Sequence, residues 1–247
     1  TIVTDELHSY EDGINAVSQS SYLTLGDPLT MERLMQTAAN YARLTEVNEA
    51  GHRHIVSNYF GGDAIVREDP WQWSKPYSHL ILHPGLRLVD WNGSPELKAL
   101  LLELADGYLA HGVQGPDGAW TFPEEINWSD DAERGSAGPG MTNLLMWSAY
   151  RWTGDAKYLR PIEQVLRNSG PAGLGGTING DLAAALGRPD LRDAWVQAAQ
   201  RDNAPAAALH GAWAATGDKT YLERLYDGLR KEAAFRMPMM TEDHWWV

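Results

Sequence analysis

Apolar residues along the chain recur at the three- and four-residue spacing that places side chains on one face of a helix. One such stripe follows Gly93 and contains Leu97, Leu101 and Leu104. The segments that precede a glycine are different, because "MTNLLMWSAY" (Met141–Tyr150) carries no charged residue. A helix that is apolar on every side is buried on every side. The pattern therefore predicts a buried helix, a glycine turn and then a half-exposed helix.

The glycine turns are themselves repeated. The chain reads "WTGDAKYL" at Trp152–Leu159 and "ATGDKTYL" at Ala215–Leu222. Glycine favours the end of a helix, and an Asp, Ser or Thr after it caps the next helix. A unit that recurs along a chain in this way indicates stacked helical hairpins. We predict about five hairpins, which are His8–Thr45, Tyr77–His111, Met141–Asn168, Ile178–Asp202 and Ala204–Phe235.

The order of buried helix, "TGD" turn, "YL" pair and outer helix resembles the (α/α) toroids of carbohydrate-active enzymes. The resemblance covers the whole chain. It implies an all-α fold in which residues 1–247 form a single (α/α) toroid domain with an inner and an outer ring of helices. Rings of the resembling families usually close with more hairpins than these, so we expect an incomplete ring. The rest of a longer polypeptide, or another subunit, would complete it. A helical bundle or an open α-solenoid is the alternative architecture.

Composition limits the partners. The hydrophobic content is 43%, and no apolar run approaches the roughly 20 residues that span a membrane. The net charge of -13 argues against nucleic acid as a partner, since nucleic acid selects basic surfaces. This charge also offers no long-range attraction to an acidic sugar, which local positive groups would have to hold. The absence of cysteine excludes disulfides and thiolate chemistry.

Two long connections carry most of the unusual side chains, namely Glu46–His79 and Gly112–Gly140. Each joins a predicted outer helix to the next inner helix, so both lie at the end of the ring where inner helices begin, which we call the rim. Long connections of this kind are usually functional. Flat indole faces bind the apolar faces of sugars, although each tryptophan could instead cover the core. The rim tryptophans are Trp71, Trp73, Trp120, Trp128, Trp245 and Trp246.

Histidine, tyrosine and asparagine gather on the same rim, in "GHRHIVSNY" and "KPYSHLILH". A lyase that splits a uronate glycan must neutralise the sugar carboxylate, remove the C5 proton and protonate the leaving oxygen. We predict that Tyr77 and His79 act as the acid and base. The predicted substrate contacts are His52, Arg53, His54, Asn58, Trp71, Trp73, Trp120, Glu124, Glu125, Asn127, Trp128, His210, His244 and Trp245.

This inventory is similar to that of the toroidal uronate lyases, which use Asn, His or Arg for the carboxylate and Tyr or His for proton transfer. The stretches "PYSHLILHPG" and "EEINW" most resemble the rhamnosyl-glucuronate lyases that act on heteropolysaccharides. The resemblance implies an acidic polysaccharide or oligosaccharide as substrate and a bacterial periplasmic or secreted location. The opening "TIVTDELHSYEDG" has neither the basic nor the apolar region of a signal peptide.

Two other functions fit the same rim. A glycoside hydrolase needs two carboxylates that flank the glycosidic bond, which Glu124 or Glu125 could provide together with Asp243. A noncatalytic glycan-binding domain would use the tryptophans and leave the clustered histidines without a role. Product chemistry separates these functions from a lyase.

A metal site has weak support in the sequence. His79 and His83 are four residues apart, a spacing that puts two ligands on one helix face, but the acidic residue of an HExxH string is missing. The "HRH" motif together with Glu124 or Glu125 is a second possible set of ligands. His111 is expected at the end of an outer helix, away from the other histidines. We therefore predict no cofactor, with a divalent metal as the alternative.

Overall fold

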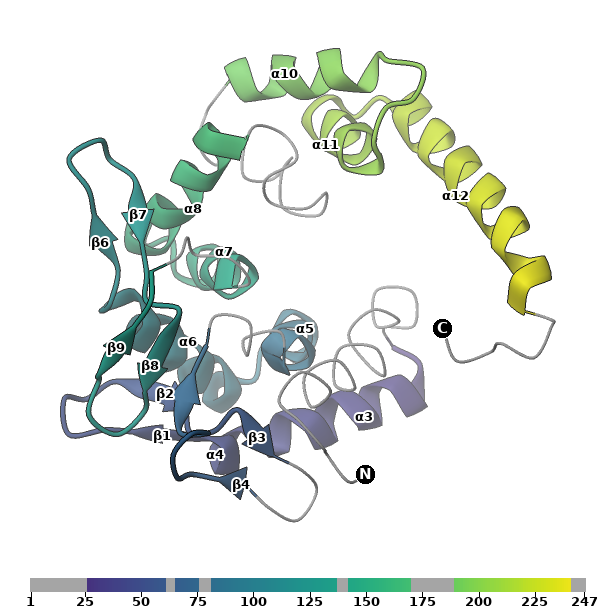
Figure 1. The fold of residues 1–247 in the computed structure, drawn as a ribbon. Helices are drawn as coiled ribbons and strands as arrows, with labels where there is room; N and C mark the ends of the chain where they lie inside the picture. Colours follow the sequence, from purple (N-terminus) through teal and green to yellow (C-terminus); the bar gives the residue numbers. More distant parts are fainter. Residues whose placement is uncertain (1–25, 61–64, 76–80, 137–141, 170–188, 241–247) are drawn as a thin grey trace. The chain divides into compact units, whose positions relative to one another are not determined.

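The computed structural model describes residues 26–60, 65–75, 81–136, 142–169 and 189–240 (Figure 1). These residues are mainly helical, with short strands in or beside the two long connections. The chain divides into two compact units, Thr1–Gln164 and Val165–Val247. Helical hairpins are therefore confirmed, whereas their closure into a single toroid domain stays a prediction.

Two of the predicted hairpins lie in the first unit. Its helices are α3 (Pro28–Ala39), α4 (Tyr41–Leu44), α5 (His83–Asn92), α6 (Pro95–Leu109), α7 (Asn143–Thr153) and α8 (Ala156–Ser169), whose last residues enter the second unit. Helix α5 turns into α6 at Gly93, and α7 turns into α8 at Gly154, both with the left-handed φ that ends a helix. Ser94 then caps α6 through its hydroxyl, as the sequence indicates.

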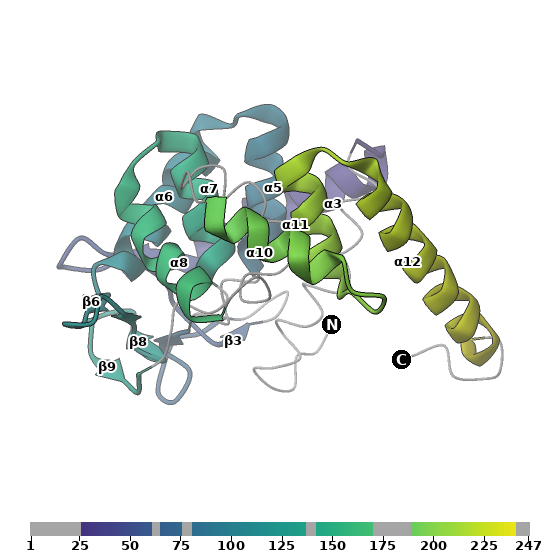
Figure 2. The same cartoon turned by 90° about the horizontal axis from the view of Figure 1, so that it is seen from above.

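Helix α5 lies at the centre of the packing in this unit, against α3, α6 and α7 (Figure 2). Tyr41 fixes its first turn, because the phenol donates to the carbonyl oxygen of Ile81 at 2.6 Å and accepts from the amide of Gly85 at 3.1 Å. The Tyr41 ring is only 1% exposed. Gly85 is required here, since a Cβ at this position would lie 2.4 Å from the Tyr41 ring.

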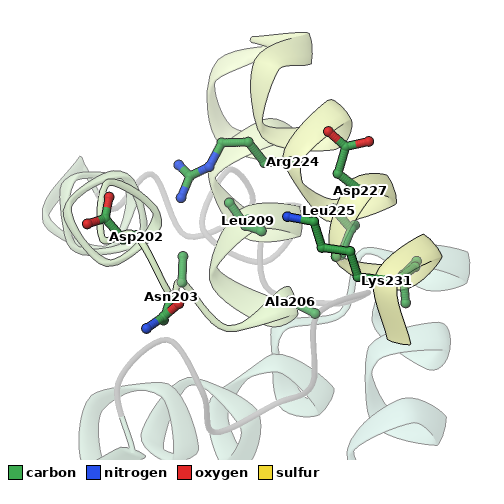
Figure 3. A pocket seen from close by; sticks show the side chains of 11 residues that line it. Asp202, Asn203, Ala206, Leu209, Arg224, Leu225, Asp227 and Lys231 are labelled. Carbon is green, nitrogen blue, oxygen red and sulfur yellow. The ribbon is translucent and has the colours of Figure 1, made fainter. Parts of the chain in front are cut away.

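The second unit contains α10 (Pro189–Ala199), α11 (Ala206–Thr216) and α12 (Lys219–Met240). Helix α11 packs on both of the others and ends at Gly217, so α11 and α12 form the last predicted hairpin. An open cavity lies between the α10–α11 turn and α12 (Figure 3). Arg224, one of the two cations that line it, already donates to the carbonyl oxygens of Ala199, at the end of α10, and of Arg201, in the turn that follows. We therefore assign this cavity a structural role.

The prediction of an all-α fold is incomplete, because both long connections form strands. The first contains β1 (Thr45–Val47), β2 (Arg53–Ile55), β3 (Tyr59–Phe60), β4 (Ile65–Val66) and β5 (Trp73–Ser74), and the second contains β6 (Val113–Gln114), β7 (Trp120–Thr121), β8 (Glu125–Asn127) and β9 (Glu133–Arg134). Three two-stranded ladders, β1–β2, β3–β4 and β6–β7, stay within one connection. The sheet β5–β8–β9 joins the two connections, with Trp73 opposite Asn127.

Strand β2 lies directly on α6. The contact centres on Gly107, where a Cβ would lie 2.4 Å from the carbonyl oxygen of Arg53. Gly107 itself is buried, as are Leu104 and Tyr108 on the same helix. Since the main chain of a strand cannot give way as a flexible side chain can, glycine at this position sets the distance between the hairpin β1–β2 and the helix.

Gly107→Ala should therefore destabilise the protein by about 1–3 kcal/mol, because the added methyl group meets main-chain atoms in a packed interface. Chemical denaturation followed by circular dichroism measures the loss. The matched control is Gly228→Ala in α12, where nothing lies within 4 Å of the added Cβ. That variant should be about 0.5–1 kcal/mol more stable than the parent. Equal responses of the two variants would contradict the packing described here.

Candidate metal centre

The start of strand β2 presents two histidines on one side, because His52 directly precedes the strand and His54 lies within it. Successive side chains of a strand alternate between its faces, so His52 and His54 point to one side and Arg53 to the other. Arg53 donates through Nε to Glu103 of α6 at 2.7 Å. The preceding turn is held by Asn48, whose Oδ1 accepts from the amide of His52 at 3.0 Å. The hairpin β1–β2 thus directs the two imidazoles to the side opposite the Arg53 side chain, where His111 lies 5.5 and 5.4 Å from their rings.

A third histidine comes from the end of α6. His111 follows the last residue of the helix and is 8% exposed. Its Nδ1 lies 2.7 Å from Oε1 of Glu133 in β9. This contact occupies Nδ1, so Nε2 is the ring nitrogen that remains for the cluster. The centre of the His111 ring lies 5.5 Å from that of His52 and 5.4 Å from that of His54.

Asp131 closes the group from the turn between β8 and β9. Its carboxylate lies 2.8 Å from Nδ1 of His52, 3.0 Å from Nε2 of His54 and 3.5 Å from Nε2 of His111. Asn48 also donates to it at 2.5 Å. The Asp131 backbone has a φ of 60°, a left-handed conformation that a non-glycine residue adopts only when its surroundings require it.

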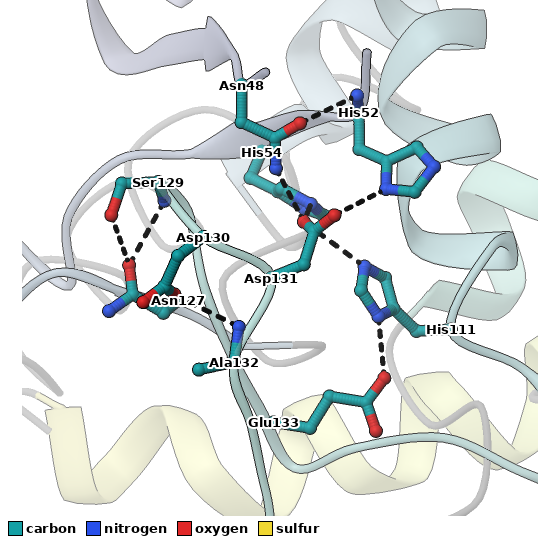
Figure 4. Close-up of polar contacts among 10 residues, drawn as sticks. All are labelled: Asn48, His52, His54, His111, Asn127, Ser129, Asp130, Asp131, Ala132 and Glu133. Atoms are coloured by element: carbon teal, nitrogen blue, oxygen red, sulfur yellow. Dashed lines mark hydrogen bonds and ion pairs between the residues drawn. The ribbon is translucent and has the colours of Figure 1, made fainter. Parts of the chain in front are cut away.

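The turn that carries Asp131 is built from short polar side chains. The amide of Asp131 donates to the carbonyl oxygen of Asn127 at 3.1 Å. The amide of Asn127 donates to the carbonyl oxygen of Ala132 at 2.8 Å. The side chain of Asn127 accepts from both the amide and the hydroxyl of Ser129. Asp130 accepts from the amide of Ala132. These bonds fix the turn and direct the Asp131 carboxylate at the three imidazoles (Figure 4).

His52, His54, His111 and Asp131 together could hold a metal ion. Each offers one ligand atom, and these atoms all lie within 4.8 Å of one another. The side chains of His54 and His111 are buried, whereas those of His52 and Asp131 are 32% and 19% exposed. The group is therefore enclosed on the side of β2 and α6 and reachable from solvent at His52. We call these four residues the His–Asp cluster.

The electrostatics of the cluster favour a neutral imidazole beside an ionised carboxylate. Burial lowers the pKa of His54 to about 4. The neighbouring His111 and His52 also lower this pKa, whereas Asp131 raises it. Burial alone would raise the pKa of Asp131, but hydrogen bonds from His52, His54 and Asn48 outweigh it and lower the pKa. Neutral imidazole nitrogen and ionised carboxylate are the states that bind metals.

The structure corrects two parts of the sequence-based interpretation. His111 is not apart from the other histidines but joins His52 and His54. The carboxylate of the cluster is Asp131, and not Glu124 or Glu125. The "HRH" motif is the signal that the sequence did contain, since two histidines separated by one residue share a face of a strand.

Other predicted substrate contacts lie in the sheet that joins the connections or beside it. Trp73 is 5% exposed and lies under the guanidinium of Arg134, 3.5 Å from the ring centroid. Trp128 lies under Arg67 at 5.9 Å. Trp71 packs on Tyr59 with a ring-centroid distance of 5.1 Å. These three indoles come together from both connections, and each already has a partner on one face.

The remaining predicted contacts are more scattered. Trp120 stacks on Phe122, which stacks on Tyr108 of α6, so this indole continues the helix core. Asn58 is buried, and its main-chain amide donates to the carbonyl oxygen of Trp71. Glu124 is exposed, and His210 lies in α11 of the second unit, beside Trp213.

Four of the predicted residues fall outside the part of the chain that the structure describes. They are the acid and base, Tyr77 and His79, and two of the substrate contacts, His244 and Trp245. Their roles stay predictions. His83, the possible partner of His79 in a metal pair, begins α5, and no hydrogen-bond partner of its buried Nε2 is found among the described residues.

Comparisons of the chain with protein-family models, with curated proteins and with solved structures found no match. Among the helices that the structure describes, none is long and apolar enough to cross a membrane. The case for function therefore rests on the geometry of the described residues.

His83 gives the folded protein a dependence on pH. Burial lowers its pKa to about 4, whereas an unfolded histidine titrates near 6.5. As pH falls through this window, the unfolded chain binds the proton first, so the free energy of unfolding decreases. Between pH 7 and 4.5 the parent should lose roughly 1–3 kcal/mol more than His83→Gln, as measured by denaturant melts. Parallel pH profiles for the two proteins would refute this expectation.

Proposed function

We propose that this chain holds a divalent transition-metal ion in the His–Asp cluster. The observation that carries the proposal is the convergence of three imidazole nitrogens and one carboxylate within 4.8 Å. Imidazole nitrogen suits Zn²⁺, Cu²⁺, Fe²⁺ and Ni²⁺, whereas Ca²⁺ and Mg²⁺ prefer sites made of oxygen. Zn²⁺ binds histidine nitrogen and aspartate or glutamate oxygen, usually with four ligands in all.

Metal binding is tested by titrating chelator-treated protein with Zn²⁺ in a calorimeter. The parent should bind one Zn²⁺ per chain, and His52→Ala should weaken binding at least about 100-fold because it removes a ligand atom at the accessible side of the cluster. The matched control is His210→Ala, which removes a histidine of the second unit and should bind as the parent does. Equal affinity of both variants would place the ion elsewhere.

We further propose that the chain is a polysaccharide lyase that cleaves a uronate-containing glycan by β-elimination. In this reaction a base removes the proton at C5, the bond between C4 and the glycosidic oxygen breaks, a double bond forms between C4 and C5, and an acid protonates the leaving oxygen. Tyr77 and His79 are the proposed acid and base, by resemblance to the toroidal uronate lyases. The reaction needs positive groups beside the substrate carboxylate.

The pairing of β5 with β8 supports this activity. It brings residues of both connections into one sheet, where Lys75 and Arg134 approach the same carboxylate, that of Glu125, at 2.9 and 3.8 Å. Two cations therefore gather at this sheet, and one of them, Arg134, covers the ring of Trp73, in a chain whose net charge is -13. Lys75 also directly precedes the segment that contains Tyr77 and His79. This is the local combination of charge and indole that an acidic sugar would require.

The hydrolase alternative receives less support from the same contacts. Glu125 is held between Lys75 and Arg134, so its carboxylate is already engaged by cations. Asp243, which would complete the hydrolase pair, lies outside the described residues. A noncatalytic glycan-binding module would form neither the unsaturated product of a lyase nor the reducing ends of a hydrolase.

The lyase activity is tested on a panel of uronate-containing polysaccharides by following the ultraviolet absorbance of the unsaturated product. Tyr77→Phe and His79→Ala should each reduce the rate by about 10²–10⁴-fold, the usual contribution of acid–base groups, with unchanged thermal midpoints. Tyr226→Phe, at an exposed position of α12, is the matched control. Reducing ends without absorbance would indicate a hydrolase. Binding of a glycan without either product would indicate a noncatalytic module.

A further inference from the structure

We infer that the metal ion of the His–Asp cluster is a structural cross-link that fastens the two long connections to the end of α6. This inference rests on the metal binding proposed above. It assigns the ion a closed coordination shell made of protein atoms, Nδ1 of His52, Nε2 of His54, Nε2 of His111 and a carboxylate oxygen of Asp131. The ion class is a borderline divalent metal that accepts tetrahedral coordination, with Zn²⁺ first.

The number of protein ligands indicates a structural and not a catalytic ion. Zinc that acts in a reaction keeps a coordination position open for water or substrate, whereas structural zinc is enclosed by four protein ligands. Asp131 lies 2.8, 3.0 and 3.5 Å from the ring nitrogens of the three histidines, so its carboxylate can serve as the fourth ligand beside them. Four protein ligands of this kind fill a tetrahedral shell.

The ligands come from three separate segments of the chain, so the ion would link these segments. His52 and His54 come from the hairpin β1–β2, His111 from the end of α6, and Asp131 from the turn between β8 and β9. These segments lie far apart along the chain, so an ion held by all three closes long loops. Binding energy at such a site becomes folding energy, because the unfolded chain does not hold the ligands together.

Contacts outside the ligand atoms indicate that the site is prepared for an ion. Glu133 accepts from Nδ1 of His111 at 2.7 Å, which fixes the tautomer that leaves Nε2 free of a proton. Asn48 donates to Asp131 and also holds the turn before His52. We therefore assign Glu133 as a positioning residue, since it acts on the ion only through His111 (Figure 4).

The sheet β5–β8–β9 depends on the same link. Asp131 lies between β8 and β9, and β5 pairs with β8, so a fixed Asp131 fixes the strands that carry Trp73 and Arg134. Removing the ion should loosen this sheet while leaving the helical hairpins in place. Any loss of activity on chelation would then follow from the loosened sheet and not from lost Lewis-acid chemistry.

The coordination shell is tested by replacing Zn²⁺ with Co²⁺ in the full chain. The visible absorption should be intense, as for four-coordinate Co²⁺, and should not change on addition of azide or of a uronate oligosaccharide, because no position is open. A spectrum that shifts with azide would overturn the closed shell. Failure of both Zn²⁺ and Co²⁺ to bind would instead overturn the proposed metal binding, so the two failures are distinguishable.

Hydrogen exchange tests the cross-link itself. Zn²⁺ should slow the exchange of the amides of residues 125–134 at least about tenfold relative to the chelated protein, with little change in α7. Unchanged exchange in residues 125–134 on binding of Zn²⁺ would show that the ion does not fasten the sheet.

Glu133→Gln tests the positioning residue. Zn²⁺ affinity should fall about 10–100-fold, with an unchanged Co²⁺ spectrum once the site is saturated. The matched control is Glu124→Gln, because Glu124 is an exposed glutamate of the same connection that makes no contact with a ligand in the described structure. If both variants bind Zn²⁺ as the parent does, Glu133 has no positioning role.

Discussion

The arrangement of the described site depends on the close approach of β2 to α6. Gly107 has no side chain, and the carbonyl oxygen of Arg53 lies 2.4 Å from where its Cβ would be. This approach places the opposite face of β2 next to the last turn of the helix, where His111 emerges. The contact between β2 and α6 thus brings three imidazoles together, although neither segment carries a complete metal-binding motif of its own.

The helical part of the fold could be predicted because its signals are local. Gly93, Gly154 and Gly217 each end a helix with a left-handed φ, and Ser94 caps the helix that follows. The strands could not be predicted in the same way, because most contain two or three residues and show no alternation of apolar and polar positions. Their pairing is decided by contacts between distant segments, such as Trp73 with Asn127.

The candidate site was only partly visible in the sequence for the same reason. His52 and His54 were assigned to a sugar carboxylate from residue type alone, and their "HRH" motif was one of two possible metal sets. The approach of His111 and Asp131 follows from the ends of α6 and of β8, which no local pattern reveals. The tryptophans show a further limit. Trp73 and Trp128 lie under arginines and Trp120 continues the helix core, so an aromatic-rich connection indicates packing as readily as sugar binding.

The left-handed backbone of Asp131 places two separate demands on one position. Its φ of 60° is tolerated well by glycine and asparagine, and poorly by branched residues, whereas the cluster requires a negative charge. Glycine would preserve the turn and supply no ligand, and glutamate would keep the charge but fit the turn less well. A single substitution to glycine would therefore remove the carboxylate from the cluster while leaving the main chain of the turn undisturbed.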